Sequence, residues 1–227
     1  MLGKVIFGAL AAACTATLAA GSATAQVRQN DVRAEGILDL FYKVDADWTL
    51  NVYGKIQRDH DLSGWNGVEF RPNAIYSLSP AWAAAAGYVQ FQPIETTART
   101  ERGAFQDISH RMHFDKLGMH NRLRINETFA DKSSALRIFS SYLLSLRHPI
   151  GESDWFAYLS DQPYFNLKVD GTGRQAGFYL NKATLGIGRT IAPGMVATLW
   201  YELSETNVQG GHDTRHTFLL GLDIHFN

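Results

Sequence analysis

The C-terminal stretch, residues 213–227, reads DTRHTFLLGLDIHFN. From Phe218 to Phe226 every second residue is apolar, and the residues between them are mostly small, polar or charged. Successive side chains of a β-strand point to opposite faces, so this period of two predicts a strand. One apolar and one mixed face fit a half-buried strand of a soluble protein. They fit equally well a membrane barrel strand with lipid outside and a polar lumen inside.

Residues 1–25 have the features of a secretory signal peptide. Lys4 precedes an apolar, alanine-rich run, which ends in the small residues Ala23-Thr24-Ala25. A positive start, an apolar middle and a small-residue site predict cleavage directly after this tripeptide. A membrane anchor, a buried helix or a lipoprotein cut before Cys14 are the weaker alternatives. We therefore expect residues 26–227 to form the exported mature protein.

The composition of the mature chain excludes several classes of protein. Cys14 is the only cysteine, so no disulfide is expected after cleavage. Acidic and basic residues are interspersed and the formal net charge of the full chain is only −1, so no nucleic-acid partner is expected. No cofactor is expected either. No mature stretch approaches the ~18 apolar residues of a membrane-spanning helix. The chain must therefore be held by burial or by closure of a sheet.

Segments with a period of two recur from residue 36 to the end, and no helical period is found. Their length of about ten residues suits a tilted strand that crosses a membrane. Short connections are expected at 45–47, 79–81, 115–118, 147–153 and 190–194, and longer ones at 59–66, 93–104, 166–176 and 204–213. This alternation predicts one all-β domain, an antiparallel transmembrane β-barrel with short periplasmic turns and longer outer loops. A soluble β-sandwich is the alternative.

The number of strands is harder to predict. Eleven segments can be counted, but a bacterial barrel with both chain ends in the periplasm needs an even number. We therefore expect twelve strands, with residues 26–34 as a poorly patterned twelfth, and ten strands as the alternative.

Aromatic residues stand near the ends of several segments. In a membrane barrel, tryptophan and tyrosine gather at the two water interfaces. An interfacial girdle is therefore predicted from Trp48, Trp82, Trp155 and Trp200, and from Tyr42, Tyr76, Tyr158 and Tyr201.

Arginine is the most prominent polar residue on the expected lumen faces. Buried charges need partners because removing an unpaired ion from water is costly. We therefore expect a charge cluster that largely fills the lumen of a small barrel, or else an electropositive path for a small anion or lipid headgroup. Its predicted members are Asp39, Arg58, Glu69, Arg71, Arg122, Arg124 and Arg137.

Hydrolase chemistry has only weak candidates, Ser109 and His113. They share one strand face with Asp107, but same-face neighbours on a strand lie nearly ~7 Å apart, so these three residues cannot form a triad alone. A lipid acyl hydrolase would need partners from adjacent strands, such as His120 or Glu127. No metal site is expected, because the histidine spacings do not suit strands or loops.

The chain resembles, over about residues 36–226, a family of uncharacterised outer-membrane β-barrels of Gram-negative bacteria, known only as a domain of unknown function. The resemblance implies fold and location, and no activity. It rests on the order of loose motifs: Asp47-Trp48, Tyr76-Ser77-Leu78-Ser79-Pro80, Gly87-Tyr88, His110-Arg111, Asn121 to Glu127, Asn181 to Gly188, and His216. Where members often carry Glu-His-Arg, this chain has Ser109-His110-Arg111.

The terminal strand also resembles the signal that the barrel assembly machinery reads. Gly221, Ile224 and Phe226 match its glycine and hydrophobic positions, whereas Leu219 replaces a usual polar residue and Asn227 follows the phenylalanine. The sequence thus predicts a non-catalytic, porin-like outer-membrane barrel, monomeric and surrounded by lipid, with a structural or small-solute transport role. The alternatives are an outer-membrane lipid acyl hydrolase and a secreted ligand-binding β-sandwich.

Overall fold

The computed structural model describes residues 29–59, 61–94, 100–130, 136–168, 176–208 and 211–226. Within these ranges no helix is long and apolar enough to cross a membrane. The predicted signal peptide, including Cys14, lies outside the described residues. The strands are β1 (Gln29–Lys43), β2 (Trp48–Asp59), β3 (Gly64–Ser77), β4 (Trp82–Pro93), β5 (Glu101–Phe114), β6 (Leu117–Ala130), β7 (Leu136–Pro149), β8 (Trp155–Lys168), β9 (Gly177–Ala192), β10 (Met195–Val208) and β11 (Gly211–Phe226).

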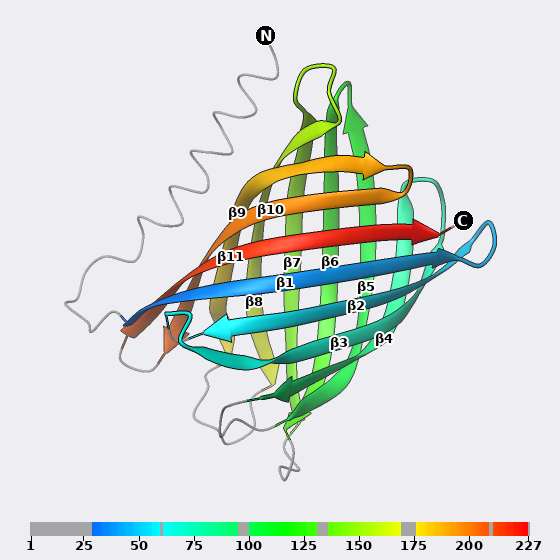
Figure 1. The fold of residues 1–227 in the computed structure, drawn as a ribbon. Helices are drawn as coiled ribbons and strands as arrows, with labels where there is room; N and C mark the ends of the chain where they lie inside the picture. The colour runs from blue at the N-terminus through cyan, green and yellow to red at the C-terminus, as the bar shows by residue number, and fades with distance from the viewer. Residues whose placement is uncertain are drawn as a thin grey trace.

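The strands form one closed barrel in which each strand pairs with its neighbours in the sequence (Figure 1). All these pairs are antiparallel except the closing pair, β1 with β11, which is parallel. The predicted all-β, largely antiparallel barrel is thus confirmed. A single closed sheet also replaces the alternative of a sandwich of two sheets.

Both predicted strand numbers were wrong, because the described residues form eleven strands. Residues 29–34 do not make a separate strand but extend β1. Strands that alternate in direction leave the first and the last parallel when their number is odd. The requirement for an even number assumed that both ends of the barrel wall lie on the same side. The eleven segments counted in the sequence were the strands themselves.

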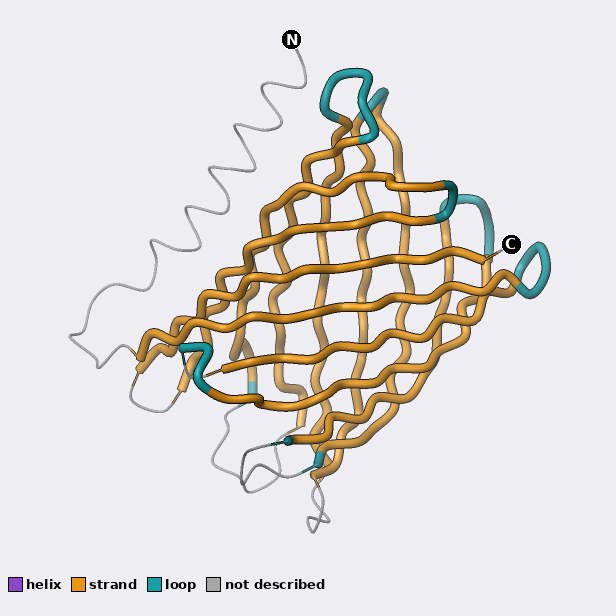
Figure 2. Tube along the Cα trace, in the orientation of Figure 1, coloured by secondary structure: helices purple, strands orange, loops and turns teal. Residues whose placement is uncertain are grey.

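The two ends of the barrel differ in their connections. The turn end carries the connections β1–β2, β3–β4, β5–β6, β7–β8 and β9–β10, and the loop end carries the other five (Figure 2). All four of the connections predicted to be long are shorter than predicted: β2 and β3 leave residues 60–63 between them, β4 and β5 leave 94–100, β8 and β9 leave 169–176, and β10 and β11 leave 209–210. Polar residues near a strand end resemble a loop in sequence, so the strands were predicted too short there.

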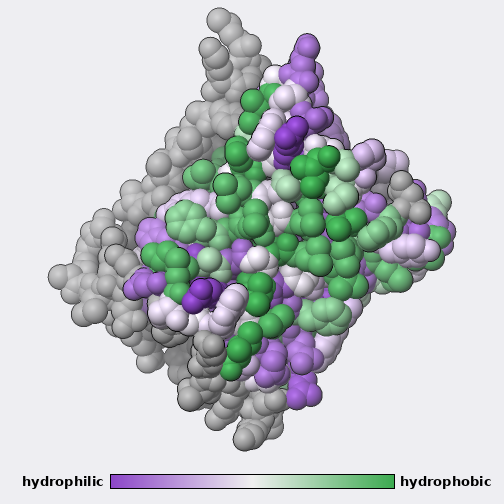
Figure 3. All heavy atoms as spheres, in the orientation of Figure 1, coloured by the Kyte–Doolittle hydropathy of each residue, from purple (hydrophilic) through white to green (hydrophobic). Residues whose placement is uncertain are grey.

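The terminal strand shows how alternation places side chains. The inward Thr217 is 1% exposed and Leu219 is 5% exposed, whereas the outward Leu220 is 65% exposed. The same alternation of buried inward and exposed outward side chains holds around the barrel. Among described residues, four hydrophobic side chains are buried against sixteen polar or charged ones, so the interior is polar and the outer wall apolar. Figure 3 shows apolar residues over much of the face that β1 and β11 share.

Some of the aromatic residues that were predicted to form an interfacial girdle face outward. Trp48, Trp82 and Trp155 are the first residues of β2, β4 and β8, and all three are exposed on the outer wall at the turn end. The prediction was wrong for Trp200 and Tyr158, which face the lumen and stack on each other with ring centroids 4.8 Å apart. Both faces of their strands carry apolar residues, so the pattern did not reveal the inward side.

The seam between β1 and β11 is held in register by inward side chains. Its pairing runs from Gln29 with Asp213 to Tyr42 with Phe226 without a shift. Near the loop end, Arg215 forms an ion pair with Asp31 at 3.1 Å. Near the turn end, Phe41 stacks on His225 with ring centroids 4.5 Å apart. A slip by one residue would turn these side chains to opposite faces, so the contacts specify the closure.

Candidate functional site

The lumen contains a cavity of about 1490 Å³ that is lined by residues from all eleven strands. It extends to the loop end, where Glu101, Ala176 and His212 line it, but Phe41 and His225 at the turn end do not. The predicted filling of the lumen is therefore only partial. On each strand, one lining residue lies nearest the turn end. We call this set the cavity floor: Asp39, Asn51, Asn73, Val89, Phe105, Arg122, Leu143, Tyr158, Thr184, Trp200 and Asp223.

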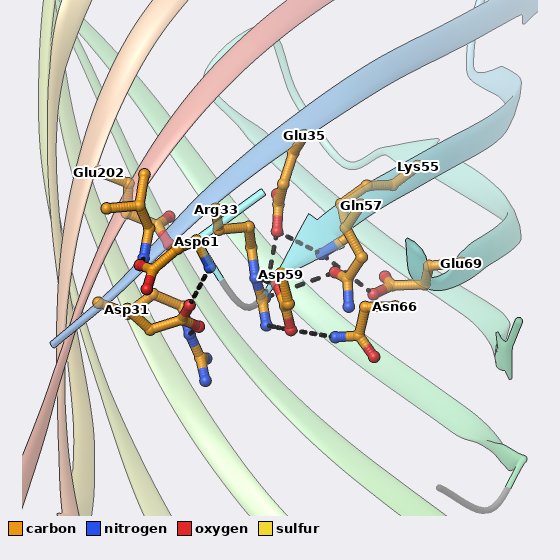
Figure 4. Close-up of polar contacts among 12 residues, drawn as sticks. Asp31, Arg33, Glu35, Lys55, Gln57, Asp59, Asp61, Asn66, Glu69 and Glu202 are labelled. Carbon is orange, nitrogen blue, oxygen red and sulfur yellow. Dashed lines mark hydrogen bonds and ion pairs between the residues drawn. The ribbon is translucent and has the colours of Figure 1, made fainter. Parts of the chain in front are cut away.

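A run of alternating charges crosses the wall formed by β1, β2 and β3 (Figure 4). Lys55 bridges Glu35 at 3.3 Å and Glu69 at 3.5 Å. Arg33 contacts Glu35 at 3.3 Å and also pairs with Asp59. These side chains are nearly buried, and such charges are tolerated only when each finds a partner. We call the whole run the charge ladder: Asp59, Arg33, Glu35, Lys55, Glu69 and Arg71.

Two further ion pairs stand apart from the ladder. Arg124 on β6 donates from Nε and Nη2 to one oxygen of Asp107 on β5, at 2.9 and 2.5 Å. Lys182 on β9 contacts Glu202 on β10 at 2.8 Å. Each pair joins neighbouring strands on the inner wall, so the charges are neutralised locally and stiffen the barrel.

Arg137 lies in an aromatic pocket nearer the loop end. Its guanidinium donates to the side-chain oxygen of Asn166 at 3.1 and 3.3 Å. It also lies 4.5 Å from the ring centroid of Phe139 and 4.7 Å from that of Tyr179. Hydrogen bonds and aromatic rings thus hold this arginine in place.

Arg122 and Trp200, both on the floor, differ from these groups. No ion pair among the described residues includes Arg122, and its buried Nε has no hydrogen-bond partner. The indole Nε1 of Trp200 is also buried without a partner. Gly186 makes room for this indole, because a Cβ there would collide with the indole Cδ1 of Trp200. The floor therefore offers two buried donors that the described protein groups do not satisfy.

Residues 37–215 match the family described as Protein of unknown function (DUF2490). The chain belongs to this family. The match begins within β1 and ends within β11, so it covers nearly the whole barrel wall of this DUF2490 protein. No curated protein matches the chain.

The structure places six of the seven predicted cluster residues against the cavity: Asp39, Glu69, Arg71, Arg122, Arg124 and Arg137. Arg58 is elsewhere. The pairing of β2 with β3 shifts between Gln57 and Arg58, and the Arg58 guanidinium lies 5.1 Å from the ring of Trp65.

Several lumen charges were missed in the sequence, among them Arg33, Glu35 and Lys182. Asp31, Arg33 and Glu35 occupy alternate positions with the apolar Val32 and Ala34 between them, which is a strand pattern with apolar outward residues. Recognising that pattern would have placed both carboxylate and guanidinium on the inner wall.

The weak catalytic candidates do not come together. Ser109 contacts the backbone oxygen of Ala83 at 3.5 Å, and Asp107 is held by Arg124. His113 is exposed at the turn end. Within the described residues, no hydrogen bond joins Ser109 to a histidine, so no specific geometry favours acyl hydrolysis.

The three assembly-signal residues have distinct places in the barrel wall. Gly221 faces inward, and a Cβ there would lie 2.4 Å from Thr198 Oγ1. Ile224 and Phe226 lie on the outward face near the turn end, where Phe226 is exposed. The glycine thus has a packing reason in addition to its place in the predicted signal.

Proposed function

We propose that this DUF2490 protein is a non-catalytic outer-membrane β-barrel that passes small polar solutes through its lumen, which they enter from the loop end. The observation that carries the proposal is the inverted distribution of side chains, polar inside and apolar outside, around a cavity of about 1490 Å³. That volume exceeds the ~300–1,000 Å³ of common small-molecule sites, so small solutes fit beside the ion pairs.

The outer wall supports the membrane placement. Thirty-four large hydrophobic side chains are exposed among the described residues, and most of them lie at outward positions of the strands. Soluble monomers rarely expose contiguous apolar patches larger than about 300–600 Å². A closed barrel also satisfies its backbone hydrogen bonds internally, which lipid requires.

The orientation follows from the connections. We infer that the turn end faces the periplasm and the loop end faces outward. Export would use the predicted signal peptide, residues 1–25, and insertion would use the assembly machinery acting on Gly221, Ile224 and Phe226. The exposed Trp48, Trp82 and Trp155 would then lie at the periplasmic interface.

Membrane placement is tested by cell fractionation and by gel migration with and without heating. We expect recovery in the outer membrane and a folded form that migrates differently until boiled. A protein that is fully soluble without detergent would overturn the proposal.

Solute entry is tested by swelling of liposomes that contain the purified barrel, with arabinose as the solute. Ser160 is buried on the inner wall of β8 and lines the cavity, whereas its neighbour Leu159 faces outward. We expect Ser160→Trp to slow swelling several-fold and Leu159→Trp to leave it unchanged. Equal rates for both variants, or no swelling with the unaltered barrel, would refute solute entry.

A further inference from the structure

We propose that the cavity floor binds a small zwitterionic solute. Its cationic group would lie against Asp39 and Asp223, and its anionic group against Arg122. This inference rests on the proposed function, because it names the class of solute that the lumen would select.

The two carboxylates of the floor lie side by side at the seam. Asp39 on β1 and Asp223 on β11 are paired residues of the parallel ladder, and both line the cavity. Adjacent strands lie about 4.8 Å apart, so the two negative charges share one small region. Asn51 donates a hydrogen bond to Asp39 and is itself fixed by Asn73 at 2.5 Å. No ion pair among the described residues includes either aspartate, although Arg122 acts electrostatically on Asp39 and Arg147 on Asp223, so both carboxylates lack a cation in direct contact.

Arg122 stands on the opposite side of the floor. In the strand order β6 is five strands from β1 and five from β11, so it lies directly across the barrel from the seam. Six other lumen cations contact a carboxylate, and Arg137 is held by Asn166 and two rings. The six paired cations are Arg33, Lys55, Arg71, Arg124, Lys182 and Arg215. Arg122 is therefore the floor cation whose charge is left for a ligand.

Two unpartnered donors lie on different parts of the floor, one on Arg122 of β6 and one on Trp200 of β10, four strands away. Arg122 Nε and Trp200 Nε1 are both buried and both lack a hydrogen-bond acceptor among the described groups. A buried donor without an acceptor is destabilising, so an anionic oxygen beside the cavity-facing side of the Arg122 guanidinium would offset part of the cost of its burial. The stacked rings of Tyr158 and Trp200 form a flat wall at this level, against which a short carbon chain would pack.

Charge on two walls selects against singly charged solutes. A simple anion would satisfy Arg122 but meet the seam carboxylates without a counter-charge, and a simple cation would meet the reverse problem. A solute with an amine at one end and a carboxylate at the other satisfies both walls. A free amino acid or a short peptide belongs to this class.

The test compares three probes of similar length by equilibrium dialysis against the purified barrel in detergent: 4-aminobutyrate, butyrate and butylamine. We expect 4-aminobutyrate to bind at least about tenfold more tightly than either single-charge probe. The reason is that 4-aminobutyrate makes two charged hydrogen-bonded contacts, whereas each single-charge probe makes one. Arg122→Gln should weaken 4-aminobutyrate by about ten- to a hundredfold and leave butylamine unchanged. Asp223→Asn should weaken both amines. Arg58→Gln, which removes an arginine outside the cavity, is the control and should change nothing.

Heat-modifiable migration of each variant confirms that it has folded. Equal binding of the three probes, or an Arg122→Gln barrel that binds 4-aminobutyrate like the unaltered one, would overturn the zwitterion site. If arabinose enters liposomes while no probe binds, the floor site is wrong but solute entry stands. If arabinose does not enter and no probe binds, both proposals fail.

Discussion

The Lys182–Glu202 pair allows a quantitative test of how the lumen charges support the barrel. The two groups are 2.8 Å apart, with side-chain exposures of 25% and 11%, and no other ion pair includes either of them among the described residues. At an effective dielectric constant of about 20, two unit charges at this distance attract by roughly 6 kcal/mol. The cost of removing both from water offsets most of this attraction.

Removing only the lysine leaves that cost without the attraction. We therefore expect Lys182→Met to lower the free energy of unfolding by about 3 kcal/mol, at the lower end of what broken buried pairs show because Lys182 is partly exposed. Adding Glu202→Gln should restore about 2 kcal/mol, since no unpaired charge then remains. The measurement is urea unfolding of the barrel in lipid vesicles, followed by tryptophan fluorescence.

The double variant is the decisive control. If Lys182→Met costs under about 1 kcal/mol, the pair is solvated and contributes little. If the double variant is as unstable as the single one, the loss comes from packing of the lysine stem rather than from an uncompensated carboxylate. Either result would refute the reasoning that pairing is what makes these inward charges tolerable.

Three further predictions concern the wall. Gly186→Ala should prevent heat-modifiable folding or cost about 2–3 kcal/mol, because its Cβ would lie 2.4 Å from the Leu199 carbonyl oxygen; Gly118→Ala, whose nearest neighbour is 3.7 Å away, should be tolerated in the same gel assay. Phe226→Ala should reduce the amount of barrel in outer-membrane fractions several-fold, and equal recovery would count against an assembly signal at this residue. Asp31→Asn should cost less than about 1 kcal/mol in urea unfolding, because its pair with Arg215 is partly exposed.

The alternation of side chains carried most of the fold prediction. Phe218 to Phe226 already read as a strand, and the same period gave eleven segments whose closure into a barrel the structure confirms. The error was the expectation of an even number of strands. Asp31, Arg33 and Glu35 alternate with small residues, so the start of β1 resembled a separate weak segment rather than an extension of the first strand.

The side-chain contacts inside the lumen were harder to predict from the sequence. Alternation indicates that Arg71 and Arg122 face inward, but it does not tell which carboxylates they meet. Those contacts depend on how far each strand is shifted against its neighbours around the closed sheet. Lys55 meets Glu69 directly across the β2–β3 ladder, whereas Arg122 faces Ser109 and Leu143 and finds no acid. Trp200 shows the same limit, since hydrophobicity alone assigns a tryptophan to lipid.

Because β1 and β11 pair in parallel, one additional strand between them would make every pair in the wall antiparallel. β1 enters the wall at the loop end and β11 leaves it at the turn end, so both run in the same direction along the seam. A strand inserted there in the opposite direction would be antiparallel to both neighbours. A connection of about fifteen residues from the end of β11 back to the start of β1 would span this gap in extended form. A circularly permuted chain joined in this way would therefore have a twelfth strand. Its new N- and C-termini would lie together, at either the turn end or the loop end.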